Sequence, residues 1–140
     1  MICIYCLGET RVVNSRHQKR PNTVWRRRHC QQCGTVFTSI EEADLSASIV
    51  VRKPEAKTND LEPFSRDKLM LSIYDSLKHR KTALKDAQSL TRTIINQIHN
   101  HTHEACVDTY VIVEVSLKVL QRFDKIAATH YAAFHPEKRV

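Results

Sequence analysis

The sequence predicts an α+β protein made of two parts, a small metal-stapled β-ribbon over residues 1–43 and a mainly helical domain with a small β-sheet over residues 44–140. Two C-x-x-C pairs lie within the first 33 residues, and most of the excess positive charge lies in the same stretch. From residue 65 onward apolar residues recur at helical spacing. The length of 140 residues suits a small metal-bound module followed by a domain of about 100 residues.

The composition is that of a globular protein, with 41% hydrophobic and 26% charged residues. No apolar run approaches the roughly 20 residues that a membrane-spanning helix needs. The first residues lack a charged segment followed by an apolar core, so we expect no secretion signal. A chain that stays in the reducing cytoplasm uses paired cysteines as metal ligands more often than as disulfides.

The four paired cysteines, Cys3, Cys6, Cys30 and Cys33, predict a structural Zn²⁺ site in a rubredoxin-like zinc ribbon. Two residues between cysteines let both sulfurs turn onto one ion, and two such knuckles fill a tetrahedral shell. A redox-active dithiol has the same spacing, but the strand–helix–strand pattern expected around it is missing. Cys106 has no partner in the sequence and is expected to be a buried core thiol.

Positive charge is unevenly distributed along the chain. Residues 41–140 carry fifteen basic and fourteen acidic residues, a net charge of +1. Residues 1–40 have one acidic residue, Glu9, and a net charge of +6 from seven basic side chains, Arg11, Arg16, Lys19, Arg20, Arg26, Arg27 and Arg28. This asymmetry favours contact with a polyanion through the first part. The alternative is a solvated charged face, which normally mixes both signs.

Residues 11–13, 25–29 and 35–38 are predicted to form the strands of the ribbon. Strand alternation then places Arg26 and Arg28 on one face and Arg27 on the other. A guanidinium group can grip phosphate oxygens or guanine with two hydrogen bonds, so these three arginines, with Arg16, are the candidate DNA contacts. We expect Trp25 to form the small core of the ribbon, although it could instead stack on a nucleotide.

The second part is predicted to begin after an acidic break at residues 41–44. Residues 48–53 are predicted to form a strand, residues 54–60 a polar loop, and residues 61–64 a short returning segment. Ser65 is expected to cap a helix with Asp67 in its first turn and one apolar stripe of Leu69, Met70, Ile73 and Leu77.

Further helices are predicted along the rest of the chain. A helix after Thr82 should bury Leu84, Ala87, Leu90, Ile94, Ile95 and Ile98. The three histidines in residues 99–103 indicate a polar loop rather than a metal site, and Asp108 is a candidate cap for the next segment. Residues 111–120 fit either a buried helix or a strand, and residues 126–134 fit a final helix.

The motifs of both parts together resemble the NrdR family of bacterial transcriptional repressors, which joins a zinc ribbon to an ATP-cone domain. The resemblance rests on the first C-x-x-C and on residues 12–16, 26–34, 37–41, 50–53, 62–64, 68–69 and 126–134, in this order. It covers essentially the whole length. The chain departs from the family pattern at residues 54–61, where the loop is longer and has no glycine.

The resemblance implies a repressor of ribonucleotide reductase genes that is not an enzyme and acts in the bacterial cytosol, associated with the nucleoid when bound. It implies double-stranded operator DNA, ATP or dATP as regulatory ligand, and a homo-oligomer as partners. Carried over residue by residue, the nucleotide would contact Val51, Arg52 and Lys53, with Glu62 and Lys68 nearby. Without the resemblance, Lys53 and Lys68 could be ordinary surface lysines.

Two alternatives to this function remain at the level of the sequence. One is a zinc-ribbon nucleic-acid-binding protein whose cone has lost its nucleotide and serves only for assembly. The other is an enzyme that uses the cone as an allosteric lobe. The sequence contains neither a G-x-x-x-x-G-K-[ST] phosphate loop nor a convincing nucleophile–base arrangement, which argues against the enzyme hypothesis.

Overall fold

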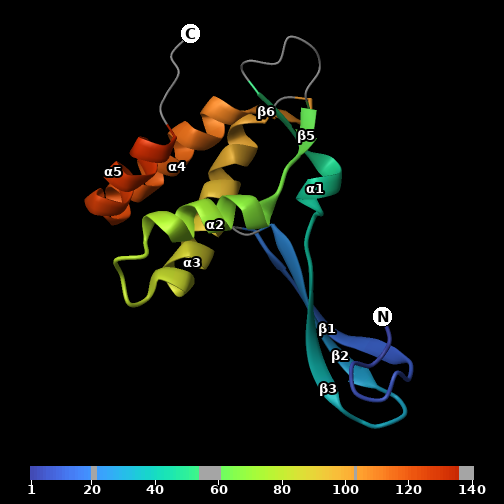
Figure 1. Ribbon diagram of the computed structural model, residues 1–140. Helices are drawn as coiled ribbons and strands as arrows, with labels where there is room; N and C mark the ends of the chain where they lie inside the picture. The colour runs from blue at the N-terminus through green and yellow to red at the C-terminus, as the bar shows by residue number, and fades with distance from the viewer. Residues whose placement is uncertain (20–21, 54–60, 103, 136–140) are drawn as a thin grey trace. The chain divides into compact units, whose positions relative to one another are not determined.

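A computed structural model of the chain describes residues 1–19, 22–53, 61–102 and 104–135. The chain divides into two compact units, Met1–Ala43 and Asp44–Val140. The first unit is all β, and the second combines helices with a small sheet, which confirms the predicted α+β class (Figure 1).

The first unit is a three-stranded antiparallel sheet with strand order β1-β2-β3. Its strands are β1 (Thr10–Gln18), β2 (Thr23–Cys30) and β3 (Val36–Glu41), each longer than the sequence predicted. The register shifts between Val12 and Asn14, so one extra residue bulges from β1. Beyond this bulge, the side chains of β1 point to the opposite face from the one that simple alternation along the strand would predict.

The small core of the first unit contains Cys3, Cys30 and Phe37. Trp25 is only partly buried and lies outside this core, so the prediction that it forms the core is wrong. The register explains the difference. Phe37 pairs with Arg28, whereas Trp25 stands three positions earlier on β2 and therefore faces the other side of the sheet.

The second unit has a three-stranded sheet of order β5-β4-β6, formed by β4 (Val50–Arg52), β5 (Leu61–Pro63) and β6 (Cys106–Asp108). β5 returns antiparallel to β4, as predicted, whereas β6 runs parallel to β4 and was not predicted. Ser48, expected in a strand, ends the short helix α1 (Leu45–Ser48). Cys106 is half-buried at the start of β6 rather than buried in the core. The loop predicted over 54–60 lies outside the described residues.

The helices of the second unit are α2 (Arg66–Ser76), α3 (Ala83–Ile98), α4 (Thr109–Phe123) and α5 (Lys125–Phe134). Ser65 caps α2 as predicted, because its hydroxyl accepts a hydrogen bond from the amide of Lys68 at 3.2 Å. Residues 111–120, ambiguous in sequence, are helical. Leu84 is 57% exposed, which contradicts its predicted burial. The buried stripe of α3 runs through Ala83 and Ala87, one position before Leu84 and hence about 100° around the helix.

The four helices enclose the hydrophobic core, whose most completely buried members include Ile73, Leu77, Ile94, Ile98 and Leu120. The histidine stretch forms a 3₁₀ turn, η1 (His99–His101), with no buried residue, as expected for a polar loop; His103 lies outside the described residues. Among the described residues, no helix has the length and apolar character needed to cross a membrane.

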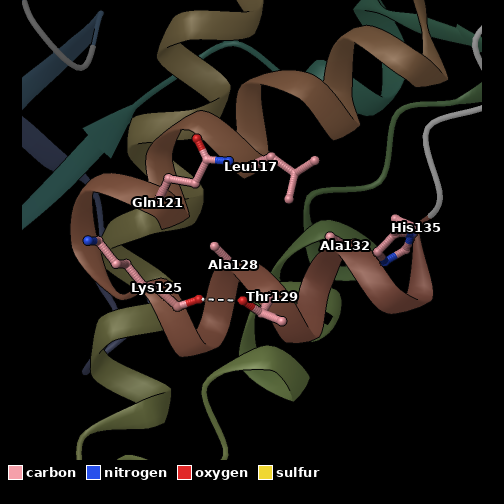
Figure 2. A pocket seen from close by; sticks show the side chains of 7 residues that line it. All are labelled: Leu117, Gln121, Lys125, Ala128, Thr129, Ala132 and His135. Atoms are coloured by element: carbon pink, nitrogen blue, oxygen red, sulfur yellow. Dashed lines mark hydrogen bonds between the residues drawn. The ribbon is translucent and has the colours of Figure 1, made fainter.

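A groove of about 800 Å³ runs along α4 and α5 (Figure 2). Leu117 and Ala128 are the buried residues in its lining, Lys125 lies at one end and His135 at the other. None of the described residues that the sequence assigned to nucleotide binding lines this groove.

The junction between α4 and α5 is organised by the carboxylate of Asp124, whose side chain is only 11% exposed. One oxygen accepts hydrogen bonds from the amides of Ile126 and Ala127 at 2.9 and 3.1 Å, which caps α5. The other accepts from His79 and Arg80, both at 3.0 Å. The amide of Ala127 and the imidazole of His79 lower the pKa of Asp124 to about 2. Asp124 therefore joins the loop after α2 to the start of α5.

Replacement of this carboxylate should destabilise the second unit. Asp124→Asn should lower the free energy of unfolding at pH 7 by about 1–2 kcal/mol, because it weakens the cap and leaves Arg80 without one of its anionic partners. Because folding lowers this pKa, the contribution is present above about pH 4 and is lost as the pH falls toward 2. Urea unfolding of the full chain measures the effect. The exposed Asp75→Asn is the control, and equal losses for both variants would contradict the assignment.

Candidate metal centre and nucleic-acid interface

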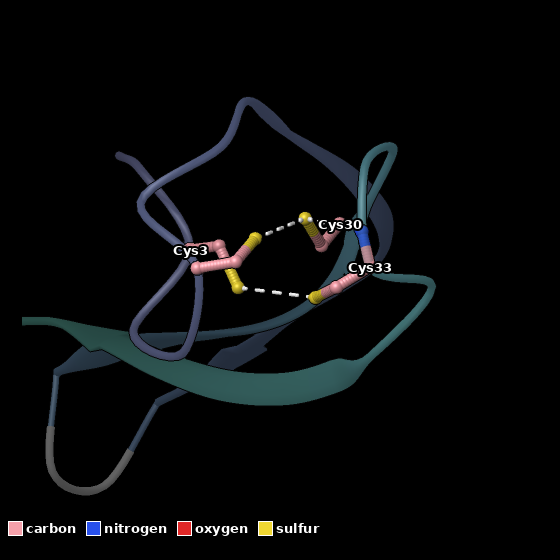
Figure 3. A group of neighbouring side chains, drawn as sticks. Cys3, Cys30 and Cys33 are labelled. Atoms are coloured by element: carbon pink, nitrogen blue, oxygen red, sulfur yellow. Dashed lines mark hydrogen bonds between the residues drawn. The ribbon is translucent and has the colours of Figure 1, made fainter.

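The four predicted ligands come together at one end of the ribbon. The sulfur atoms of Cys3, Cys6, Cys30 and Cys33 all lie within 4.8 Å of one another. Figure 3 shows the thiols of Cys3, Cys30 and Cys33 converging, and the Cys3–Cys33 and Cys6–Cys30 sulfur pairs are 3.7 and 3.4 Å apart. A tetrahedral ion with metal–sulfur bonds of about 2.3 Å requires sulfur–sulfur edges of about 3.8 Å. The geometry therefore fits one zinc ion held by four thiolates.

In each knuckle a backbone amide points at the sulfur of the first cysteine. The amide of Tyr5 points at the sulfur of Cys3, and the amide of Cys33 points at the sulfur of Cys30, both at 3.4 Å. Amide dipoles aimed at sulfur favour the thiolate, which is the form that binds metal. The two buried cysteines, Cys3 and Cys30, are the ones that receive these bonds.

Each knuckle closes with a residue in the left-handed region directly after its second cysteine. The amide of Leu7 donates to the carbonyl of Cys3, and that of Gly34 donates to the carbonyl of Cys30. Their φ angles are 62° and 70°. Glycine adopts this conformation without cost, whereas leucine is strained there. The first knuckle therefore carries a strained residue at the position where the second has glycine.

The thiols of Cys33 and Cys6 have pKa values shifted in opposite directions. The hydroxyl and amide of Thr35 lower the pKa of Cys33 to about 6. A bond from the Gly8 amide lowers the pKa of Cys6, but hydrogen bonds with Cys30 and Cys33 outweigh it and raise this pKa to about 12. A divalent ion replaces such shared protons, so metal binding by this cluster releases protons.

The sheet separates the four predicted DNA-binding arginines onto two faces. Arg26 and Arg28 share the face of Phe37, where both are engaged. Arg26 bonds Glu41 at 2.8 Å, and the Nε of Arg28 donates to the hydroxyl of Ser39 at 2.9 Å. These bonds fix both guanidinium groups to β3.

We call the other side of the sheet the open face. The pairing register places on it the side chains of Asn14, Arg16, Trp25, Arg27, Thr38 and Ile40. Arg16 pairs with Trp25 across β1 and β2, and Arg27 stands two positions after Trp25. Within residues 1–19 and 22–43, neither Arg16 nor Arg27 has a side-chain hydrogen bond or ion pair. Two unengaged guanidinium groups thus flank an aromatic ring.

The predicted nucleotide-contacting residues lie around the start of the second unit. Lys53 forms an ion pair with Glu62, and Lys68 bonds the other oxygen of Glu62 at 3.4 Å. The hydrogen bond with Lys53, its charge and that of Lys68 lower the pKa of Glu62. Val51 pairs with Glu62 across the sheet and is half-buried against the core. The structure thus brings Lys53, Glu62 and Lys68 into one cluster.

Arg52 is separated from this cluster and is tied to the start of α4. Its guanidinium lies 3.8 Å from the carboxylate of Asp108, and its carbonyl accepts a hydrogen bond from Thr109. Asp108 occupies the cap position of α4, as suspected, but its side chain makes no capping bond. The sequence missed this contact because it depends on the parallel pairing of β4 with β6.

Comparison with known proteins bears on both units. Residues 1–41 match the family described as "Transcriptional repressor NrdR-like, N-terminal domain". A protein of Symbiobacterium thermophilum named transcriptional repressor NrdR is 31% identical over 137 residues, covering 98% of this chain and 88% of that protein. The chain belongs to the NrdR family. The NrdR protein of Staphylococcus aureus strain JH9 is 30% identical over 138 residues, covering 98% of this chain and 85% of its own length.

Membership of the NrdR family confirms the resemblance drawn from the sequence motifs. NrdR relatives are named as transcriptional repressors, so the chain is a regulator and not an enzyme. The matched ribbon and its four cysteines indicate Zn²⁺, and the repressor family implies binding to DNA.

Proposed function

We propose that the chain is a zinc-dependent, nucleotide-responsive repressor that binds double-stranded operator DNA through the open face of its ribbon. The observation that carries the proposal is the pair Arg16 and Arg27 beside Trp25 on the open face. Residues 1–40, which form most of this unit, carry a net charge of +6. DNA phosphates attract such a surface, and guanidinium groups at fixed positions can read base edges.

In this proposal residues 1–43 form the DNA-binding domain, and Cys3, Cys6, Cys30 and Cys33 hold one zinc ion. The zinc ion supplies structure and no reaction, because four protein sulfurs leave it no open position. It fixes the end of β2, so the arginines of that strand stand at defined positions. Arg26 and Arg28 are weaker candidates for DNA contacts, because their guanidinium groups already donate hydrogen bonds to Glu41 and Ser39.

We further propose that residues 44–140 form an ATP-cone that binds ATP or dATP and assembles into a homo-oligomer. Lys53 and Lys68 supply positive charge for the phosphates, and Val51 and Glu62 pair beside them on β4 and β5. Arg52, also on β4, would have to leave Asp108 to reach the nucleotide. Phosphate would displace the carboxylate of Glu62 from one or both lysines, and that carboxylate would then be free to accept from a ribose hydroxyl. Family membership supports a cytoplasmic repressor of ribonucleotide reductase genes.

The nucleotide assignment is tested by calorimetry of the zinc-loaded chain with ATP and with dATP. Lys68→Ala should weaken the binding of whichever nucleotide binds by about tenfold, because one ion pair with phosphate is lost. Lys78→Ala is the matched control, since Lys78 is an exposed lysine just beyond the other end of α2, paired with Asp75. An unchanged dissociation constant for Lys68→Ala would remove this residue from the site.

Absence of saturable heat from either nucleotide would favour the alternative, a zinc-ribbon DNA-binding protein whose cone mediates assembly only. The operator assignment is tested separately. The chain is sized with each nucleotide, and each species is then added to duplex DNA from a ribonucleotide reductase promoter. Equal binding to promoter and unrelated duplexes in 150 mM salt, about the physiological ionic strength, would contradict specific repression.

A further inference from the structure

The first zinc knuckle carries an exposed apolar surface that the proposed function does not use. Its five members are Met1, Ile2, Ile4, Tyr5 and Leu7, which are between 56% and 72% exposed. We call these five residues the knuckle patch. The sulfurs of Cys3 and Cys6, which lie between them in sequence, belong to the four-cysteine cluster, whereas the five apolar side chains are exposed. A contiguous stretch of exposed apolar side chains on a charged module indicates a binding surface.

Leu7 supports the interpretation of the knuckle patch as a binding surface, because both its backbone conformation and its side-chain exposure are unfavourable. Its backbone is left-handed, with φ of 62°, and its side chain is 72% exposed. Glycine, which stands at the equivalent place in the second knuckle, would remove both the strain and the exposed apolar surface. Burial of the Leu7 side chain in a contact would offset part of this cost.

The position of the patch separates it from the DNA-binding surface. Tyr5 packs edge-on against Phe37, with ring centroids 6.5 Å apart. Phe37 shares the face of Arg28, so the first knuckle lies on the side of the sheet opposite to the open face. Duplex DNA on the open face therefore leaves the knuckle patch uncovered.

We propose that the knuckle patch is a self-association surface that meets the same patch on a second copy of this chain. Charge favours this occupant. Residues 1–8 carry the α-ammonium of Met1 but no charged side chain, whereas the side chains of residues 1–40 as a whole carry +6, so two ribbons repel each other least when they meet here. A patch that meets itself across a two-fold axis needs no other complementary surface.

The size of the patch sets the strength of the contact. Five such side chains offer on the order of 500 Å² per copy, or about 1,000 Å² in a symmetric pair, near the lower limit for specific interfaces. The contact is therefore weak for free ribbons and becomes effective when the second unit or DNA holds two copies together. The inference rests on the proposed zinc centre, which holds the knuckle in shape.

Site-specific photo-crosslinking tests the contact in the full zinc-loaded chain. Tyr5→benzoylphenylalanine is prepared in an equal mixture of isotope-labelled and unlabelled chains and irradiated with and without duplex DNA. The expected product joins residue 5 of one copy to residues 1–9 of another, identified by mass spectrometry. Crosslinks confined to residues 44–140, or to DNA, would overturn the proposal.

Leu7→Gly provides the second arm, because it removes a patch residue while relieving backbone strain. We expect the zinc content to stay at one ion per chain, the melting temperature to stay the same or rise, and the crosslink yield to fall about tenfold. Leu84→Ser, which removes an equally exposed leucine from α3, should leave the yield unchanged. A full yield in Leu7→Gly would overturn the proposal. Lack of zinc in the parent chain would contradict the proposed function, whereas a zinc-loaded chain without the crosslink contradicts this inference alone.

Discussion

Removal of zinc should unfold residues 1–43 and abolish DNA binding, while residues 44–140 keep their fold. Within residues 1–19 and 22–43 the buried hydrophobic core consists of Cys3, Cys30 and Phe37, and the two cysteines are proposed zinc ligands. Burial alone cannot offset the conformational entropy of so small a unit. Structural zinc contributes about 10–16 kcal/mol to modules of this kind, so metal binding and folding are one event. The second unit has its own core of helices and needs no metal for it.

Two-dimensional amide NMR of the full chain during titration with a chelator measures this outcome directly. Resonances of β1, β2 and β3 should collapse to unfolded positions as zinc is withdrawn, and those of α2 to α5 should persist. Cys30→Ser should reproduce the effect in the presence of zinc. Cys106→Ser is the control, since Cys106 lies on β6 of the second unit and is not a member of the four-cysteine cluster. An ordered ribbon in metal-free protein would contradict the zinc assignment.

Arg27→Ala should weaken binding to operator DNA by about 10- to 100-fold, and Arg16→Ala by a similar factor, with zinc content unchanged. Within residues 1–19 and 22–43 neither guanidinium group has a hydrogen bond or ion pair, so each variant should remove a proposed DNA contact without breaking a polar contact among these residues. If the contact is to phosphate, the slope of log affinity against log salt should also fall by about one. Fluorescence anisotropy of labelled duplex across a salt series gives both quantities.

Arg26→Ala is the matched control for this pair. It removes an equally charged residue from the same strand, but one whose guanidinium is held by Glu41 on the opposite face. We expect a small loss of affinity that follows from net charge alone and disappears in high salt. Equal losses for Arg26→Ala and Arg27→Ala would show that the open face does not define the interface.

The sequence identifies the metal ligands because their spacing alone places four sulfurs around one ion. It also separates Arg26 and Arg28 from Arg27, since alternation is a local property of a strand. It does not reveal which face is free. That depends on the pairing of β2 with β3, which brings Glu41 to Arg26 and puts Phe37 rather than Trp25 in the core.

In the second unit, helices are recognisable wherever several apolar residues repeat, as in α2 and α3. The misplacement of Leu84 shows that an error of one position moves a side chain from the core to the surface. β6 is too short for any periodicity to show, and it exists because it pairs with a strand far away in the chain. The Asp124 contacts also join distant segments, and no local pattern encodes them.

The parallel pairing of β4 with β6 has a consequence for biosynthesis. All four zinc ligands lie between Cys3 and Cys33, so the ribbon can acquire its metal soon after these residues emerge from the ribosome. The second unit cannot close its sheet until Cys106–Asp108 has been translated, and its core also needs α5. Until then, the apolar faces of helices α2 and α3 remain exposed to solvent. A nascent chain is thus able to contact nucleic acid before the half that is proposed to regulate it has folded.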